Sequence, residues 1–165
     1  MTTAFLELDI VRDEGTRYAA YPDPGSPLAK AMLAGRPTAG LSGAPWTIGN
    51  GHTGREIHEG LVWTQAEVDA ARRADIAAVR QGLDTALPWW RTLSDLRQDC
   101  LVNQAFNMGV HGLLGFGTYL GLVKAGQYAG AAQDELHTLW ATQVGVRAVR
   151  LARQMASNVH QSLPA

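Results

Sequence analysis

The chain has 165 residues, a hydrophobic fraction of 46% and a formal net charge of −1, which fits one domain with enough apolar side chains for a core. The near-neutral charge and the lack of a basic block argue against a nucleic-acid-binding protein. No apolar run approaches the roughly 18 residues that a membrane-spanning helix needs, so we expect no stable membrane insertion. Glu7 and Asp9 interrupt the N-terminal region, so we also expect no secretory signal peptide.

Cys100 is the single cysteine, which excludes an intramolecular disulfide and a cysteine-rich metal site. A lone cysteine could instead be a catalytic nucleophile, but its predicted mid-helix position favours a buried thiol. The histidines show no spacing typical of metal ligands. We therefore expect no metal and no other cofactor.

The first part of the chain reads as one helix followed by a turn-rich segment. Apolar spacing predicts a helix over residues 3–12, and the Glu14-Gly15 pair is a suitable end for it. Residues 16–62 are rich in glycine and proline, and alternation within 16–21 and 46–49 predicts two short strands. One or two helical turns are expected between Leu28 and Leu33.

The second part of the chain reads as helices. Thr64 followed by Glu67 has the spacing of a capping box, which predicts a long helix that ends before Pro88. Further helices are expected over 92–108, 116–125, 128–139 and 143–158. The predicted fold class is therefore α+β, a single two-lobed domain over 1–165. Its expected parts are a first helix (1–13), a β-rich lobe (14–62) with an insertion (24–46), a connecting helix (63–87) and a helical lobe (88–165).

Two carboxylates and a hydroxyl in the turn-rich segment suggest acid–base chemistry. Glu14 follows an apolar helical run, where partial burial is expected, while Asp23 lies in a proline-flanked turn that should face solvent. Glycosidic hydrolysis needs one protonated carboxyl as acid and a second group that handles water. Thr47 follows in a glycine-flanked strand. Each residue also has a structural interpretation: a surface carboxylate, a turn former and a strand threonine.

The spacing E-x8-D followed by T-I-G-x-G-H resembles the phage-type lysozymes of the T-even endolysin family, glycoside hydrolase family 24. Here it reads Glu14, Asp23 and Thr47 to His52. The segment N-Q-A-F-N-M-G from Asn103 resembles the family's cleft helix. The segment W-A-T-Q from Trp140, with its two later arginines, resembles the family's late W-x-x-Q-x-x-x-R-x-x-R pattern. The resemblance covers nearly the whole chain and implies a lysozyme-like fold.

The resemblance implies a role for each matching residue. Glu14 would be the general acid, and Asp23 with Thr47 would position the attacking water in an inverting hydrolysis. Asn103, Asn107 and Gln143 would bind saccharide. Three supporting residues complete the set, each with an expected carboxylate partner: Arg147 with Glu14, Arg150 with Asp13, and His52 with Asp75. Asn103 and Asn107 could equally be solvated polar residues on one helix face.

The insertion between Asp23 and Thr47 is the main departure from the family pattern. It has 23 residues, from Pro24 to Trp46, where the family prototype has only a few. Lengthening a loop costs little free energy, so Asp23 could keep its place beside Thr47. Alternatively the insertion displaces Asp23, which would leave Glu14 and Thr47 as the reliable pair of site residues.

The resemblance implies an endolysin that cuts the β-1,4 bond between N-acetylmuramic acid and N-acetylglucosamine in peptidoglycan glycan strands. A lytic transglycosylase and a non-catalytic peptidoglycan-binding module are the alternatives, and the presence of Asp23 and Thr47 favours hydrolysis. We expect a monomer that stays in the host cytoplasm until a holin opens the membrane, and that then acts on the cell wall from the periplasm.

Overall fold

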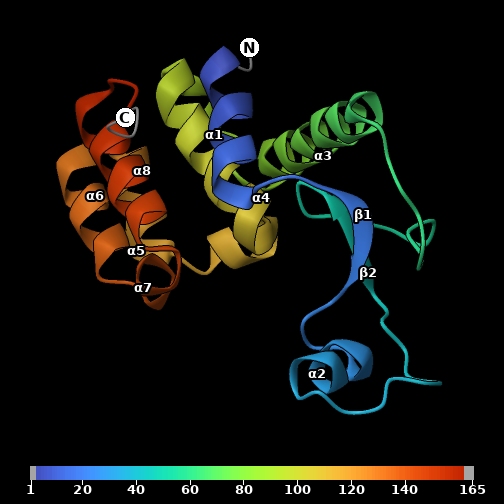
Figure 1. The fold of residues 1–165 in the computed structure, drawn as a ribbon. Helices are drawn as coiled ribbons and strands as arrows, with labels where there is room; N and C mark the ends of the chain where they lie inside the picture. The colour runs from blue at the N-terminus through green and yellow to red at the C-terminus, as the bar shows by residue number, and fades with distance from the viewer. Residues whose placement is uncertain (1–2, 162–165) are drawn as a thin grey trace. The chain divides into compact units, whose positions relative to one another are not determined.

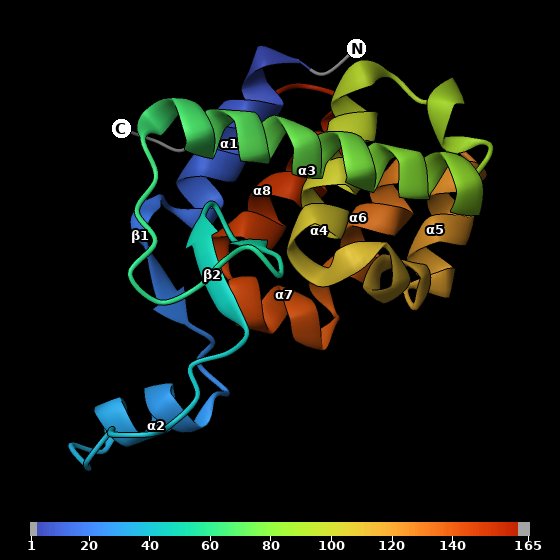
Figure 2. The same cartoon turned by 90° about the vertical axis from the view of Figure 1, so that its right-hand side faces the viewer.

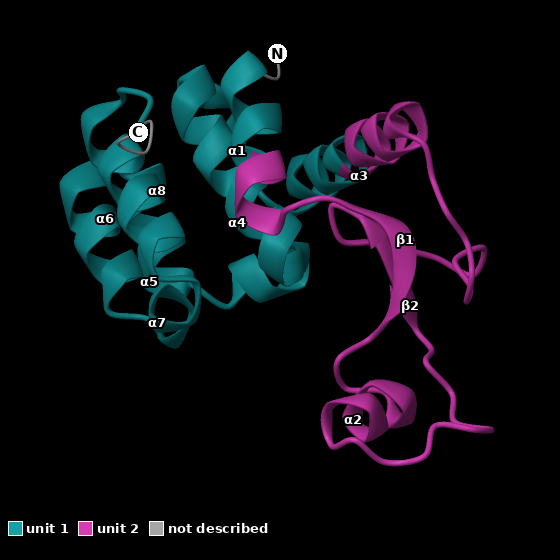
Figure 3. Ribbon diagram, viewed as in Figure 1, with its two compact units in different colours: residues 1–9, 76–165 teal, residues 10–75 magenta. Residues whose placement is uncertain are grey.

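In a computed structural model of the chain, which describes residues 3–161, eight α-helices and a three-stranded antiparallel sheet are present (Figure 1). This arrangement confirms the predicted α+β fold class. Contacts divide the chain into two compact units, Met1–Asp9 with Ile76–Ala165 and Ile10–Asp75 (Figure 3). The boundaries between the two units fall after Asp9 and after Asp75. In residues 3–161 no helix combines the length and apolar character needed to cross a membrane.

The sheet belongs to the unit formed by residues 10–75. Strand β1 (Arg17–Pro22) pairs with β2 (Trp46–Gly49), and β2 pairs with β3 (His52–Thr53). In the β1–β2 register Arg17 faces Gly49, Tyr21 faces Thr47 and Pro22 faces Trp46, with an irregularity between Arg17 and Tyr21. The two predicted strands are therefore present, and their pairing closes the insertion at its base.

The insertion folds back on itself instead of forming an open loop. It contains helix α2 (Pro27–Leu33), whose first turn is capped by the Ser26 hydroxyl, which accepts a hydrogen bond of 3.1 Å from the Ala29 amide. The Leu28 amide donates to the Ser42 carbonyl over 3.1 Å, which ties the two sides of the insertion together. Both views show α2 beyond the ends of β1 and β2 (Figures 1 and 2).

Helix α3 (Gln65–Ala86) begins with the predicted capping box. The Glu67 carboxylate accepts a hydrogen bond of 2.7 Å from the Thr64 amide, and the Thr64 hydroxyl accepts one of 3.3 Å from the Glu67 amide. Both bonds satisfy amide groups that the first helical turn leaves without intrahelical partners. The helix ends before Pro88, as predicted from the sequence.

The other unit is helical. It contains the 3₁₀ helix η1 (Trp90–Thr92), α4 (Asp95–Leu114), α5 (Gly117–Lys124), α6 (Tyr128–Leu136), α7 (Leu139–Val144) and α8 (Val146–Ser157). Helix α8 packs against α4, α6 and α7, and α6 also packs against α5 (Figure 2). The core of this unit is formed by fully buried side chains, among them Trp90, Leu101, Tyr119, Leu151 and Met155.

At two glycines the helix boundaries differ from those predicted from the sequence. Residues 143–158 do not form one helix, because Gly145 has a φ of 55° and separates α7 from α8. Gly109 has a φ of 79° inside α4, so the chain kinks where the helix was expected to end and then continues to Leu114.

Buried ionic and polar groups connect distant parts of the helical unit. Nη1 of Arg150 lies 2.8 Å from Oδ2 of Asp9, and both side chains are almost completely buried. Helix α1 (Ala4–Glu14) carries Asp9, so this ion pair fixes the start of α1 to α8. Breaking a buried pair of this kind by removing one partner typically costs about 3–5 kcal/mol.

Candidate active site

Glu14 is the last residue of α1, and the chain turns sharply after it. Gly15 has a φ of 69°, a conformation that favours glycine, and its amide donates to the Val11 carbonyl over 3.0 Å. The Glu14 side chain is half-buried, as expected for a carboxyl at the junction of an apolar helix and a sheet. The end of α1 therefore places Glu14 three residues before the first paired residue of β1.

Asn50 holds this turn, and the sequence interpretation gave it no role. Its side-chain amide donates to the Gly15 carbonyl and, over 3.0 Å, to the Thr16 hydroxyl. Its amide oxygen accepts a hydrogen bond of 3.2 Å from Arg72 of α3. Asn50 is 3% exposed, so all three bonds form inside the protein. The sequence feature that could have pointed to Asn50 is its position within the T-I-G-N-G-H motif.

Thr47 lies in the middle of the sheet, between Tyr21 of β1 and Thr53 of β3. Adjacent Ile48 is completely buried and faces the core, so alternation points the Thr47 side chain to the opposite face. Thr47 is only 8% exposed, yet within the described residues its hydroxyl makes no hydrogen bond. A nearly buried hydroxyl with unused bonding capacity is suited to hold a water molecule or a substrate atom.

Asp23 continues the β1–β2 ladder by one step. Its amide donates to the Pro45 carbonyl over 2.9 Å and to the Gly43 carbonyl over 3.2 Å, so the insertion returns directly to Asp23. Because Tyr21 faces Thr47, a residue two positions beyond Tyr21 lies diagonally from Thr47 on the same face. Oδ1 of Asp23 accepts a bond of 2.7 Å from Gly25, while Oδ2 has no partner in residues 3–161.

His52 lies in β3 between two carboxylates. Its Nδ1 is 2.9 Å from Oδ2 of Asp75, the partner suggested from the sequence, and its Nε2 is 3.1 Å from Oε1 of Glu56. Burial of the ring opposes protonation, but the hydrogen bonds to Asp75 and Glu56 outweigh it and raise the pKa of His52. His52 thereby links β3 to α3. Because it pairs with Ile48, it lies on the face of the sheet opposite to Thr47.

In the helical unit, the buried Arg147 is held by Asn103. Nε of Arg147 donates to Oδ1 of Asn103 over 2.8 Å, and Nη2 donates to the Asn103 carbonyl over 2.9 Å. Asn103 is 1% exposed. In the structure Asn103 bonds to Arg147, and sugar binding by Asn103 stays a prediction. Arg150 pairs with Asp9, one helical turn before the Asp13 that the resemblance suggested.

The other two predicted sugar-binding residues are exposed. Asn107 accepts a hydrogen bond of 2.9 Å from the indole nitrogen of Trp140, and Trp140 is buried in the core. This bond fixes Asn107 in place at the surface of α4. Gln143 lies on α7 and is exposed. Both side chains are accessible to a saccharide, and their binding role stays a prediction.

The unit formed by residues 10–75 thus contains Glu14, Asp23 and Thr47 together with the supporting Asn50 and His52. The expected pairs of Arg147 with Glu14 and of Arg150 with Asp13 stay predictions. Within the part of the chain that the structure describes, no group of three His, Cys, Asp or Glu side chains is arranged to hold a metal ion.

Comparison with known proteins identifies the family of the chain. A search of curated proteins finds no match to the chain. The model of the protein family described as phage lysozyme matches residues 11–156, a range that includes every candidate site residue and nearly the whole sequence. A family match of this extent shows membership. The chain belongs to the phage lysozyme family.

Proposed function

We propose that this protein is an endolysin that hydrolyses the β-1,4 bond between N-acetylmuramic acid and N-acetylglucosamine, with inversion at the anomeric carbon. Family membership makes it a lysozyme-type peptidoglycan hydrolase in general terms. The bond cleaved, the stereochemistry and the residue roles are our proposal. They rest on the local geometry of Glu14, Asp23 and Thr47.

The observation that carries the proposal is the pair of unused polar atoms beside the β1–β2 ladder. The Thr47 hydroxyl and Oδ2 of Asp23 make no hydrogen bond within residues 3–161, and the strand register supports their lying on one face. A polar group left without a partner costs free energy unless water or substrate satisfies it. A water molecule bound between a hydroxyl and a carboxylate is oriented for attack.

In the proposed reaction, Glu14 donates its proton to the glycosidic oxygen as the bond to the anomeric carbon breaks. The water held by Asp23 and Thr47 attacks that carbon from the opposite side of the ring and gives its proton to the Asp23 carboxylate. One water is consumed and a new reducing end is formed. Glu14 is assigned the acid role because it closes α1 directly before the sheet that carries Asp23 and Thr47.

We further propose that the protein works as a monomer in host-cell lysis. It would remain in the host cytoplasm until a holin opens the membrane, and would then reach the cell wall through the periplasm. In this arrangement the timing of lysis depends on the holin and not on the endolysin.

Product analysis of digested peptidoglycan tests the chemistry. The wild-type protein is expected to produce reducing-end muramic acid, with the inverted anomer visible by NMR immediately after cleavage. Glu14→Gln is expected to lower the rate by at least about a thousandfold without unfolding the protein. Anhydro-muramic ends would establish a lytic transglycosylase instead. A Glu14→Gln variant with the wild-type rate would remove Glu14 as the acid.

A further inference from the structure

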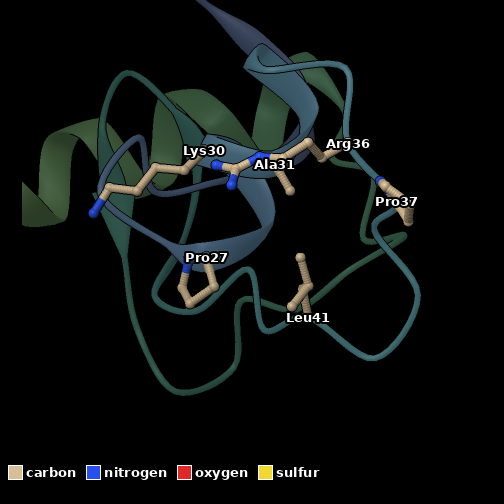
Figure 4. A pocket seen from close by; sticks show the side chains of 6 residues that line it. All are labelled: Pro27, Lys30, Ala31, Arg36, Pro37 and Leu41. Carbon is tan, nitrogen blue, oxygen red and sulfur yellow. The ribbon is translucent and has the colours of Figure 1, made fainter.

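The inserted segment carries a surface pocket that the proposed catalytic chemistry does not use. Its volume is ≈ 520 Å³, and it is lined by Pro27, Lys30, Ala31, Arg36, Pro37 and Leu41 (Figure 4). Every lining residue comes from α2 or from the segment that follows it. The pocket therefore exists because the insertion is folded, with α2 capped by Ser26 and the two sides joined by the Leu28–Ser42 hydrogen bond.

The charged residues that line the pocket are all positively charged. Lys30 and Arg36 are its charged residues, and residues 24–46 contain no Asp or Glu. Neither side chain has a carboxylate partner among residues 3–161, although ion pairs are common elsewhere in the protein. In Figure 4 the Arg36 side chain reaches across Ala31, while the Lys30 amine points away from the other labelled side chains. Arg36 is thus the cation that faces the pocket.

The remaining walls are small and apolar. Ala31 is 5% exposed, and Pro27 and Leu41 stand opposite it in Figure 4. A guanidinium above an apolar floor matches a ligand with a carboxylate next to a small alkyl group, because a carboxylate accepts two parallel hydrogen bonds from arginine. A methyl group would pack against the alanine, proline and leucine side chains.

We propose that this pocket, defined by Arg36 and its apolar floor, binds a free carboxylate of the peptidoglycan stem peptide. The inference rests on the proposed function, because it concerns the same substrate. The glycan itself is built of uncharged N-acetyl sugars once the lactyl group of muramic acid is joined to the peptide. The carboxylates and the alanine methyl groups of this polymer are therefore on the stem, which gives the cationic pocket its complementary partner.

The insertion is also connected to the catalytic candidates through the backbone. Asp23 precedes it and Trp46, the neighbour of Thr47, ends it, and the Asp23–Pro45 hydrogen bond closes its base. A stem peptide held on the insertion would thus be held by the same strands that carry Asp23 and Thr47. We expect stem-bearing substrates to be cleaved more efficiently than bare glycan for this reason.

The first test compares glycan strands that carry the stem with strands from which it has been removed. Removal leaves a lactyl carboxylate directly on each muramic acid, so a loss of activity confined to the stemmed strands assigns the effect to the stem. Soluble glycan strands with intact stems and the same strands stripped by an amidase are digested, and new reducing ends are measured. Arg36→Ala is expected to lower kcat/KM about three- to tenfold on stemmed strands and to leave the rate on stripped strands unchanged. Arg73→Ala, an exposed arginine of α3 in the same unit, is the matched control and should affect neither. An equal effect of Arg36→Ala on both substrates, or none on either, would overturn the proposal.

The second test measures binding without catalysis. The free stem tetrapeptide is titrated into the wild-type protein, and the Ala31 amide and the Arg36 side-chain signal are followed by NMR. Saturable shifts of both are expected, with the Ala31 shift lost in Arg36→Ala. No shift at about 20 mM peptide, a concentration well above weak affinities, would overturn the proposal. Peptide binding by a protein that released no reducing ends would refute the proposed function alone.

A membrane surface is the competing partner for this segment, because Leu33 is 93% exposed and Met32 is 59% exposed on the same helix. Co-sedimentation with phosphatidylglycerol vesicles, compared with phosphatidylcholine vesicles, separates the two partners. We expect the wild-type protein to stay in the supernatant with both. Co-sedimentation with the anionic vesicles that Leu33→Ser abolishes, together with equal cleavage of stemmed and stripped strands, would assign the segment to lipid and overturn the proposal.

Discussion

Asn50 donates a hydrogen bond from its side-chain amide to the main-chain carbonyl oxygen of Gly15, 35 positions earlier in the chain. The same amide also reaches the Thr16 hydroxyl, so one side chain fixes the turn directly after the proposed acid, Glu14. Arg72 of α3 holds the other end of the Asn50 amide. The position of Glu14 therefore depends on a residue of the turn that follows the Thr47 strand.

Asn50→Ala is expected to lower kcat about tenfold or more with little change in KM, because Glu14 loses its fixed position while the binding surface is kept. The free energy of unfolding should fall by about 1–3 kcal/mol, since Arg72 and the turn lose buried partners. Asn50→Asp, which still accepts from Arg72 but cannot donate to Gly15, separates the two contributions: it should retain most of the stability and still lose kcat. A normal kcat in both variants would contradict the positioning role.

Asp23→Asn and Thr47→Val should each lower kcat by roughly a hundredfold if the two side chains orient one water molecule. Because they act on the same water, the double variant should lose little more than either single one. Thr53→Val is the matched control, as Thr53 faces Thr47 from β3 and loses the same hydroxyl. Independent, multiplicative effects of the two substitutions would mean that Asp23 and Thr47 do not share a water, and normal activity of Asp23→Asn would remove Asp23 from the site.

Glu135 is expected to destabilise the fold as the pH rises. It is 1% exposed, Gln104 donates to its Oε1 over 2.7 Å, and its Oε2 has no partner in residues 3–161. Burial raises the pKa of Glu135 to about 8, above the ordinary value of 4.5, and the bond from Gln104 only partly opposes this shift. A raised pKa means that the contribution of Glu135 to stability is complete below pH 4.5 and is lost as the pH rises toward 8.

Glu135→Gln removes this titration. Between about pH 6.5 and 9 the wild-type protein should lose on the order of 2 kcal/mol more stability than the variant does, as measured by urea unfolding at each pH. Asp99, whose burial raises its pKa to about 6, titrates mostly below this window in both proteins. Glu59→Gln, an exposed carboxylate in the other unit, should follow the wild-type curve. Parallel curves for wild type and Glu135→Gln would show that Glu135 is ionised in the folded protein.

The His52 cluster has a pH dependence in the neutral range. Hydrogen bonds to Asp75 and Glu56 outweigh burial and raise the pKa of His52 above its ordinary value of 6.5. The stability that this cluster contributes is therefore complete below pH 6.5 and is lost as the pH rises through the raised pKa. Asp75→Asn should lower the pKa of His52 in an NMR titration of the ring protons, whereas Asp134→Asn in the helical unit should leave it unchanged. A pKa that does not respond to Asp75→Asn would mean that the contact is not an ion pair in solution.

The features predicted correctly from the sequence are those with local causes. The Thr64–Glu67 capping box joins residues three apart, so its bonds can form as soon as the helix starts. The strand at Trp46–Gly49 and the end of α1 before Gly15 follow from alternation and from the conformational freedom of glycine. Gly145 is a position where local patterns failed. The apolar spacing predicted one helix over residues 143–158, but the backbone conformation of Gly145 separates α7 from α8.

Periodicity, composition and motif spacing were enough to predict the fold class, the family resemblance and the residue types that the chemistry needs: Glu14, Asp23 and Thr47. Which polar groups have hydrogen-bond partners depends instead on contacts between residues that are far apart in the chain. Asn50 and Gly15 meet across 35 residues, Asp9 and Arg150 across 141, and Glu135 becomes buried because α6 packs against α5 and α8. Burial and long-range hydrogen bonds depend on how the chain packs, and no local pattern records them. Long-range contacts also bring the end of the insertion back to Asp23, and the folded insertion forms the pocket that Arg36 lines.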